Sequence, residues 1–146
     1  MASDPARTVA LMSIRPEFAD LILAGQKQVE FRRTRVSERI SHVVLYATEP
    51  VRAIVGFFEV KEIEEASPEE LWERYEDVGG ISEEKFRVYY KRSKMGVAIK
   101  VGRIVRLPVP LPLSSVEGLS RPPQSFQYID NANLEGITKP PETEAE

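Results

Sequence analysis

Lys27, Glu30 and Arg32 are the side chains whose types and spacing best suit chemistry on an anionic ligand. An ammonium group offers a point charge to a phosphate, and a guanidinium offers a planar fork that fits a phosphate or a base edge. A carboxylate accepts hydrogen bonds from an exocyclic amine such as that of cytosine. The same three residues would also form a structural ion pair, so their types leave binding and packing both open.

Charged and polar residues on both sides of this group extend the candidate ligand-binding set. Ser13, Ile14 and Arg15 end an apolar run that we expect to lie next to the group. The basic residues that follow it are Arg33, Arg35 and Arg39. Their spacing fits a track for phosphates, in which each contact adds salt-dependent affinity, but it equally fits solvated loop charges.

Hydroxyl and aromatic side chains complete the candidates. Thr48 and Ser125 are expected as polar contacts or nucleophiles, but His42 is the only histidine, so a Ser-His triad is not available. A hydroxyl activated by Lys27 is the enzymatic option, and it requires that burial lower the Lys27 pKa. Base stacking contributes about 1–3 kcal/mol per base. The aromatic candidates are Tyr46, Phe126 and Tyr128, of which Phe126 is placed in the predicted site.

The composition limits the classes of protein. The chain has 146 residues, 42% of them hydrophobic, which suits one domain with one core. It contains no Cys and one His, which argues against a disulfide, a thiolate nucleophile and a zinc site. No apolar run approaches the roughly 20 residues of a membrane span, and no signal sequence is visible. We therefore expect a cytoplasmic protein without a cofactor, a metal or a membrane partner. The sequence does not determine the oligomeric state, and a monomer is favoured over an oligomer.

The net charge of -3 conceals an uneven distribution of charge along the chain. Residues 59–84 hold eleven acids and two bases, whereas residues 85–106 hold eight bases and no acid. Residues 27–39 add five bases against two acids. Such segregation permits a basic face on a mildly acidic protein, although charged runs are also typical of solvated helix faces.

The elements that must position these residues can be predicted from local patterns. The run Thr8–Ile14 predicts a buried strand, and Pro16 starts a short helix that ends near Gly25. Alternation over Gln28–Arg32 predicts a strand with Val29 and Phe31 on one face and its charges on the other. His42–Ala47 and Ala53–Ile63 are expected to pair as a hairpin.

The second half predicts two capped helices and further short strands. Ser67 and Ser82 are expected helix caps, the first in a capping box. Residues 96–108 suggest one or two strands, and the prolines of 107–112 predict an extended edge or linker. Residues 121–129 predict a closing strand. Together these patterns predict an α+β domain built on a small barrel of mixed strands with about three short flanking helices, and a disordered acidic tail over 131–146.

The signature Gly25-Gln26-Lys27-Gln28-Val29-Glu30-Phe31-Arg32, preceded by a strand and a short helix, resembles that of the ASCH family, Gly-x-Lys-x-x-Glu-x-Arg. The stretches 55–60, 67–72 and 122–129 are also similar to ASCH sequences, so the likeness covers roughly residues 7–130, after an N-terminal extension over 1–6. The resemblance implies a PUA-like β-barrel with a cleft beside the signature. Its relatives bind RNA or act on modified nucleosides or nucleic acids.

One branch of the family resembles N4-acetylcytidine deacylases, in which a Lys is followed three residues later by a Thr nucleophile. Lys27 matches that Lys, but Glu30 stands in the Thr position. The acid of that branch would fall within residues 76–80, without a clear counterpart. The deacylase mechanism therefore lacks its nucleophile in this chain.

The favoured hypothesis is a non-catalytic module that recognises RNA, single-stranded nucleic acid or a modified nucleotide in a basic cleft. The first alternative is a hydrolase on a modified nucleoside or on RNA, with Lys27 activating a water or hydroxyl and Glu30 handling protons. The second is a regulatory protein-interaction module that uses the acidic helix after Ser67.

Overall fold

The structure is a computed structural model that describes residues 8–138. Its elements, in chain order, are β1 (Val9–Ile14), α1 (Pro16–Leu23), β2 (Val29–Arg32), β3 (His42–Ala47), β4 (Ala53–Ala66), α2 (Pro68–Tyr75), α3 (Glu83–Tyr89), β5 (Gly96–Leu111), the 3-10 turn η1 (Leu113–Ser115), β6 (Phe126–Ile129) and α4 (Ala132–Thr138).

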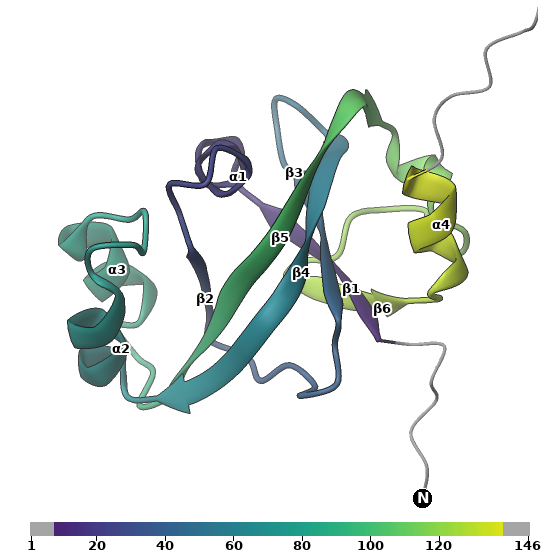
Figure 1. Ribbon diagram of the computed structural model, residues 1–146. Helices are drawn as coiled ribbons and strands as arrows, with labels where there is room; N and C mark the ends of the chain where they lie inside the picture. Colours follow the sequence, from purple (N-terminus) through teal and green to yellow (C-terminus); the bar gives the residue numbers. More distant parts are fainter. Residues whose placement is uncertain (1–7, 139–146) are drawn as a thin grey trace, which may run out of the picture.

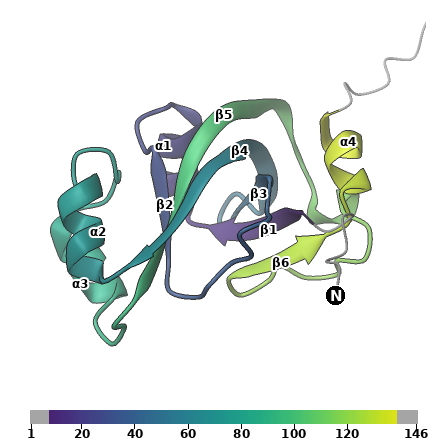
Figure 2. The ribbon, with the colours of Figure 1, turned by 60° about the horizontal axis from the view of Figure 1, so that its bottom comes forward.

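The strands form one mixed sheet in the order β2-β5-β4-β3-β1-β6. Only β1 and β3 run parallel among these strand pairs, and the expected hairpin of β3 and β4 is antiparallel. Register shifts along β4 bend the long β4–β5 ribbon, which curls the sheet into an open half-barrel (Figure 2). The predicted α+β barrel class is confirmed.

Three apolar clusters hold the sheet and its helices together. The inside of the curled sheet is filled by residues such as Met12, Leu45 and Phe58. The opposite face of β1 and β3 packs under η1 and α4 through Leu11 and Val44, among others. A third cluster joins α2 and α3 to the outer face of β2. It contains Val29, Phe31, Leu71 and Phe86. Helices α2 and α3 thus lie beside β2, at the opposite end of the molecule from α4 (Figure 1).

The helix ends follow the predicted local signals. Pro16 is the first residue of α1, and Gly25 adopts a φ of 81° just after its end, where residues other than glycine are strained. Ser67 and Glu70 form a complete capping box at the start of α2. The Ser82 side chain accepts a hydrogen bond from the Lys85 amide at the start of α3.

The proline-rich segment is part of a strand, which differs from the predicted division at residue 108. Strand β5 continues through Pro108 and Pro110 to Leu111, which pairs with Ile54 of β4. Strand β2 pairs with β5 only through residues 97–100, so the other edge of the later half of β5 has no strand partner within residues 8–138. Proline is tolerated on such an edge because no ladder hydrogen bond is lost there.

The predicted disordered tail was wrong in part, because residues 132–138 form α4. Asp130 accepts a hydrogen bond from the Ala132 amide, and Ile137 is 3% exposed in the cluster under η1. Sequence reasoning missed this helix because it is short and carries Gly136, so that burial of its apolar side rather than its helix propensity stabilises it. The predicted N-terminal extension, 1–6, and the rest of the tail, 139–146, lie outside the described residues.

Candidate functional site

Strand β2 places the signature residues on two faces. Val29 and Phe31 point toward α2 and α3, as the alternation predicted. Glu30 and Arg32 point the other way and are each 7% exposed, and Lys27, just before the strand, is 2% exposed. The predicted charged face is therefore turned inward. The three side chains lie beneath the surface and do not form the wall of an open cleft, which corrects the expected exposure of this site.

The three side chains form one ion-paired cluster. Arg32 Nη2 lies 2.9 Å from Glu30 Oε2, and Arg32 Nε donates a hydrogen bond to the same oxygen at 3.0 Å. Lys27 Nζ lies 3.8 Å from Glu30 Oε1. The structure thus brings the predicted residues together as the structural ion pair that their types allowed. A single carboxylate faces two basic groups in this cluster.

Arg32 also connects β2 to the strands at the far edge of the sheet. Its Nη2 donates to the Ser13 carbonyl at 3.0 Å, and its Nη1 donates to the Ser125 hydroxyl at 3.2 Å and to the Ser125 carbonyl at 3.4 Å. Ser13 is the penultimate residue of β1 and Ser125 precedes β6, so the guanidinium spans the gap between the two edges of the half-barrel. We call Ser13, Glu30, Arg32 and Ser125 the seam.

The two serines of the seam are tied to each other and to the loop before β6. The Ser13 amide donates to the Ser125 carbonyl at 2.9 Å, and the Ser13 hydroxyl donates to the Pro123 carbonyl at 2.6 Å. Tyr46 pairs with Ser13 in the parallel ladder of β1 and β3, so both side chains lie on the same face of the sheet. Its hydroxyl forms no hydrogen bond with another residue of the range 8–138.

Lys27 lies at the other end of the cluster, under the connection between α2 and α3. Its Nζ donates to the Gly79 carbonyl and lies 5.3 Å and 5.1 Å from the ring centroids of Phe18 and Phe31. Burial lowers the pKa of Lys27 from its ordinary value, and Arg32 lowers it further while Glu30 opposes the shift. The lowered pKa that the enzymatic hypothesis required is therefore present.

The arginines of the predicted phosphate track make different contacts. The Arg33 guanidinium lies 4.8 Å from the ring centroid of Tyr89, while Arg35 Nε lies 2.9 Å from a carboxylate oxygen of Glu65. Arg33, Arg35 and Arg39 are all exposed. Because Arg35 is already paired, the three arginines do not form a uniform line of free charges.

The remaining candidates lie around the seam with different exposures. Ile14 is a buried core residue, whereas Arg15 is exposed at the start of α1. The half-buried Thr48 donates its amide to the Ile14 carbonyl. The half-buried rings of Phe126 and Tyr128 pack on the barrel core, and their centroids lie 5.4 Å apart. Among these predicted ligand-binding residues, Ile14 is a packing residue of the core.

Sequence reasoning missed the backbone groups that complete the site. The Gly79 and Pro123 carbonyls accept hydrogen bonds from Lys27 and Ser13. The stretch 76–80, which the deacylase comparison would have used for an acid, covers Lys27 with backbone, and Glu76 and Asp77 are exposed. The available signal was the Gly79-Gly80 pair, which permits close backbone approach.

Residues 8–138 hold no group of three or more His, Cys, Asp or Glu side chains placed to bind a metal ion. Nor does any helix in that range have the length and apolar character needed to cross a membrane.

Comparison with known proteins identifies the family. The sequence profile described as "ASCH domain" matches residues 12–105, which include the signature, the ion cluster and most of the barrel. The chain belongs to the ASCH domain family. A curated relative from Zymomonas mobilis, named ASCH domain-containing ribonuclease, is 32% identical over 133 residues, covering 88% of this chain and 89% of the relative.

Solved structures agree with this ASCH assignment. The crystal structure of ASCH from Zymomonas mobilis has a TM-score of 0.82 and 29% identity, and the match covers 90% of this chain and 94% of that chain. Two further structures are single-substitution variants of the Zymomonas protein, one with a serine changed to alanine and one with a tyrosine changed to phenylalanine. The N-terminal domain of Staphylothermus marinus McrB shares the fold alone, with a TM-score of 0.58, 15% identity and coverage of 94% and 97%.

Proposed function

We propose that this ASCH domain binds single-stranded RNA over the seam and cleaves it. The observation that carries the proposal is Arg32, a guanidinium held by Glu30 and directed at two half-buried serines where the edges of the sheet meet. A planar guanidinium fork is suited to phosphate oxygens. The Zymomonas relative, similar over nearly the whole chain, is named a ribonuclease.

Cleavage of RNA without an added nucleophile uses the neighbouring 2′-hydroxyl. Its oxygen bonds to phosphorus and loses its proton, while the bond from phosphorus to the 5′-oxygen breaks and that oxygen gains a proton. The protein must therefore hold the phosphate, balance its growing negative charge and relay protons. In this proposal Arg32 exchanges its contacts with Ser125 for the phosphate, which it holds together with the Ser125 hydroxyl. Lys27 acts as a positioning residue that helps to set the charge of the cluster.

Hydroxyl groups support this assignment. The Zymomonas protein has been crystallised with one serine hydroxyl removed and, separately, with one tyrosine hydroxyl removed. The seam of this chain contains the Ser125 hydroxyl 3.2 Å from Arg32 Nη1, and Tyr46 pairs with Ser13 of the seam. Ser125 and Tyr46 are accordingly the hydroxyl groups that we propose to act at the phosphate.

The test compares single-stranded RNA, single-stranded DNA and free modified nucleosides at two salt concentrations, with the products separated by chromatography. The proposal expects salt-sensitive RNA binding, a 2′,3′-cyclic phosphate product, and no cleavage of DNA, which lacks the 2′-hydroxyl. Binding of RNA that stays intact would leave a binding module and overturn the cleavage step. Consumption of a nucleoside would favour the hydrolase of modified nucleosides, and absence of any RNA binding would overturn the whole proposal.

A matched pair of variants tests whether the cleavage activity depends on the seam. Ser125→Ala removes one acceptor of Arg32 but keeps the Ser125 and Ser13 carbonyl acceptors, so the fold should persist. We expect a loss of cleavage rate of about 100–1,000-fold, the range for a group that helps to bind the transition state. Ser120→Ala, at an exposed loop serine, is the control and should cleave as the unmodified protein does. Equal cleavage rates in both variants would show that the Ser125 hydroxyl takes no part in cleavage.

A further inference from the structure

The bases between residues 85 and 106 divide into paired and unpaired groups. The paired ones are Lys85 with Glu17 at 3.3 Å, Arg87 with Glu83 at 3.3 Å, Lys100 with Glu62 at 3.3 Å and Arg103 with Glu59 at 3.7 Å. Lys91, Arg92, Lys94 and Arg106 are exposed and form no ion pair with any residue from 8 to 138. Three of these free cations lie within four consecutive residues, just after α3.

This group of free cations lies next to the end of β2. The Tyr90 hydroxyl donates to the Arg32 carbonyl at 2.8 Å, which fixes the end of α3 against β2. The preceding residue, Tyr89, lies under the Arg33 guanidinium at 4.8 Å. A path of positively charged residues therefore leads from the end of β2, at Arg33 over the Tyr89 ring, to Lys91 and Arg92 in the loop after α3.

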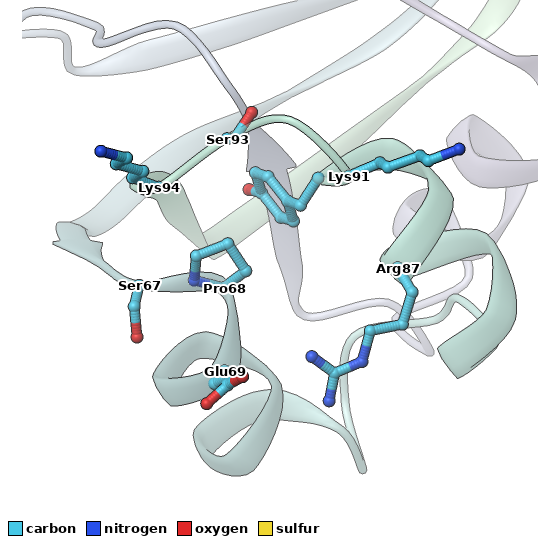
Figure 3. Close-up of a pocket in the computed structure, with 8 residues that line it drawn as sticks. Ser67, Pro68, Glu69, Arg87, Lys91, Ser93 and Lys94 are labelled. Carbon is cyan, nitrogen blue, oxygen red and sulfur yellow. The ribbon is translucent and has the colours of Figure 1, made fainter.

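The surface along this path is shaped as well as charged. A hollow of about 420 Å³ separates the start of α2 from the loop after α3 (Figure 3). Pro68 and Glu69 face Arg87 across it, and Lys91 and Lys94 extend from its rim (Figure 3). The Glu69 carboxylate is the one acid among the residues lining it.

Apolar side chains flank the same cations. Val88 is 69% exposed on α3, and Met95 is 53% exposed at the end of the loop. Exposed apolar atoms next to unpaired cations suit a strand that offers phosphates and flat bases together. An acidic peptide would use the charges but has less use for the stacked Arg33 and Tyr89.

We propose that a basic strip beside the seam binds the phosphates of the RNA strand where it extends beyond the cleavage position. The residues of the basic strip are Arg33, Tyr89, Lys91, Arg92 and Lys94. This inference rests on the proposed RNA function, and it replaces the predicted track through Arg35 with one that follows the unpaired charges. The basic strip holds RNA and takes no part in the bond-breaking step.

The experiment measures binding of 2′-O-methyl RNA, which cannot be cleaved through its 2′-oxygen, as a trinucleotide and as a single strand of about 12 nucleotides, a length within known single-strand site sizes. The strip variant is K91Q/R92Q/K94Q, and the control K61Q/R103Q/R106Q removes as many exposed positive charges elsewhere. The charge-retaining K91R/R92K/K94R variant tests for rescue. Salt titrations give the slope of the logarithm of affinity against that of salt concentration.

We expect the strip variant to lose affinity for the longer strand and to lower its salt slope by about 2, at ~0.7 for each of three lost contacts. Trinucleotide binding should stay unchanged, and both the control and the charge-retaining variant should bind as the unmodified protein does. An unchanged slope in the strip variant, with RNA still bound, would overturn the basic strip alone. If the unmodified protein binds an acidic peptide or anionic vesicles through these residues and no RNA, both proposals fail.

Discussion

At the scale of single residues, the cluster shows how burial sets protonation. Lys27 sits in an apolar surrounding with one carboxylate nearby, and a second cation shares that carboxylate. Its pKa in the folded protein lies below the ordinary value of 10.5, chiefly because of burial. Between the two pKa values the unfolded chain binds more protons than the folded one, so the free energy of unfolding rises with pH across that window.

Lys27→Met should remove this pH dependence. Met keeps most of the length and the apolar character of the Lys27 stem but cannot take up a proton. As the pH rises toward 10.5, the unmodified protein should gain stability relative to the variant, because protonating the unfolded Lys27 becomes less favourable. Urea unfolding at several pH values measures the difference, and parallel curves would contradict a lowered Lys27 pKa. Burial raises the pKa of Tyr90, which gives the opposite slope above pH 10, but both proteins carry Tyr90 and this effect cancels in the comparison.

Glu30→Gln tests how much the cluster depends on its one carboxylate. The amide would leave the Lys27 and Arg32 cations facing each other while buried, and breaking a buried pair costs about 3–5 kcal/mol. Glu65→Gln is the matched control, because its Arg35 partner is largely exposed and such pairs contribute about 0–1 kcal/mol. Chemical denaturation of both variants gives the two free energies. Similar losses would mean that the buried cluster is not held by its charge pairing.

The residue types of the site could be predicted from the sequence, but their surroundings could not. Lys27, Glu30 and Arg32 were expected to converge, and they do. Their burial was not expected, because alternation in β2 reveals two faces without telling which one turns inward. The backbone acceptors from Gly79 and Pro123 belong to loops whose path depends on tertiary packing.

At the scale of elements, the connection between α2 and α3 is fitted closely to Lys27. Gly80 has a φ of 62°, and a Cβ built there would lie 2.6 Å from the Cβ of Lys27. A side chain at this position would push the connection away from the cluster. The connection between α2 and α3 therefore fits closely against Lys27, just before β2, at this glycine.

Gly80→Ala should destabilise the protein more than Gly25→Ala. Both residues have positive φ, which costs a residue with a Cβ about 1–2 kcal/mol. Gly25 has open space around an added Cβ, whereas Gly80 meets Lys27, and overpacking adds about 1–3 kcal/mol. Thermal unfolding of the two variants isolates the contact with Lys27. Equal melting temperatures would show that the connection moves aside freely.

Elements with local signals were predicted well, and those set by distant contacts were not. The capping box of α2 and the Ser82 cap of α3 lie entirely within a few residues, so the sequence displays them. The length of β5 depends on pairing with β4, and α4 depends on Ile137 reaching the cluster under η1. Neither of these contacts leaves a local trace in the sequence.

At the scale of the whole molecule, side chains join the two open edges of the half-barrel. Arg32 links β2 to the ends of β1 and β6, and the Tyr128 hydroxyl of β6 accepts a hydrogen bond from the Ser37 amide at 2.9 Å. Ser37 lies in the loop that follows β2, so both links connect the same two regions of the chain. The overall charge segregation was visible in the sequence, but which bases stay unpaired depends on carboxylates brought near by the fold.

Tyr128→Phe should loosen this closure without unfolding the protein. The variant removes only the acceptor of the Ser37 amide, a loss of about 0.5–1.5 kcal/mol. Amide hydrogen exchange at Ser37 should become faster. Tyr75→Phe, which removes the hydroxyl that bonds to Glu64 on the α2 side, should leave exchange at Ser37 unchanged. Unaltered exchange in both variants would mean that the Tyr128 contact does not restrain the loop.

The prolines of β5 have a consequence for the protein in a crowded solution. Exposed strand edges pair readily with strands of other chains and so begin aggregation. The free edge of β5 carries Arg103, Arg106, Pro108 and Pro110, all of them exposed. The arginines repel a second copy of the same edge, and the prolines lack the N–H groups that an incoming strand would need. The half-barrel can thus remain open along this edge without recruiting other chains into its sheet.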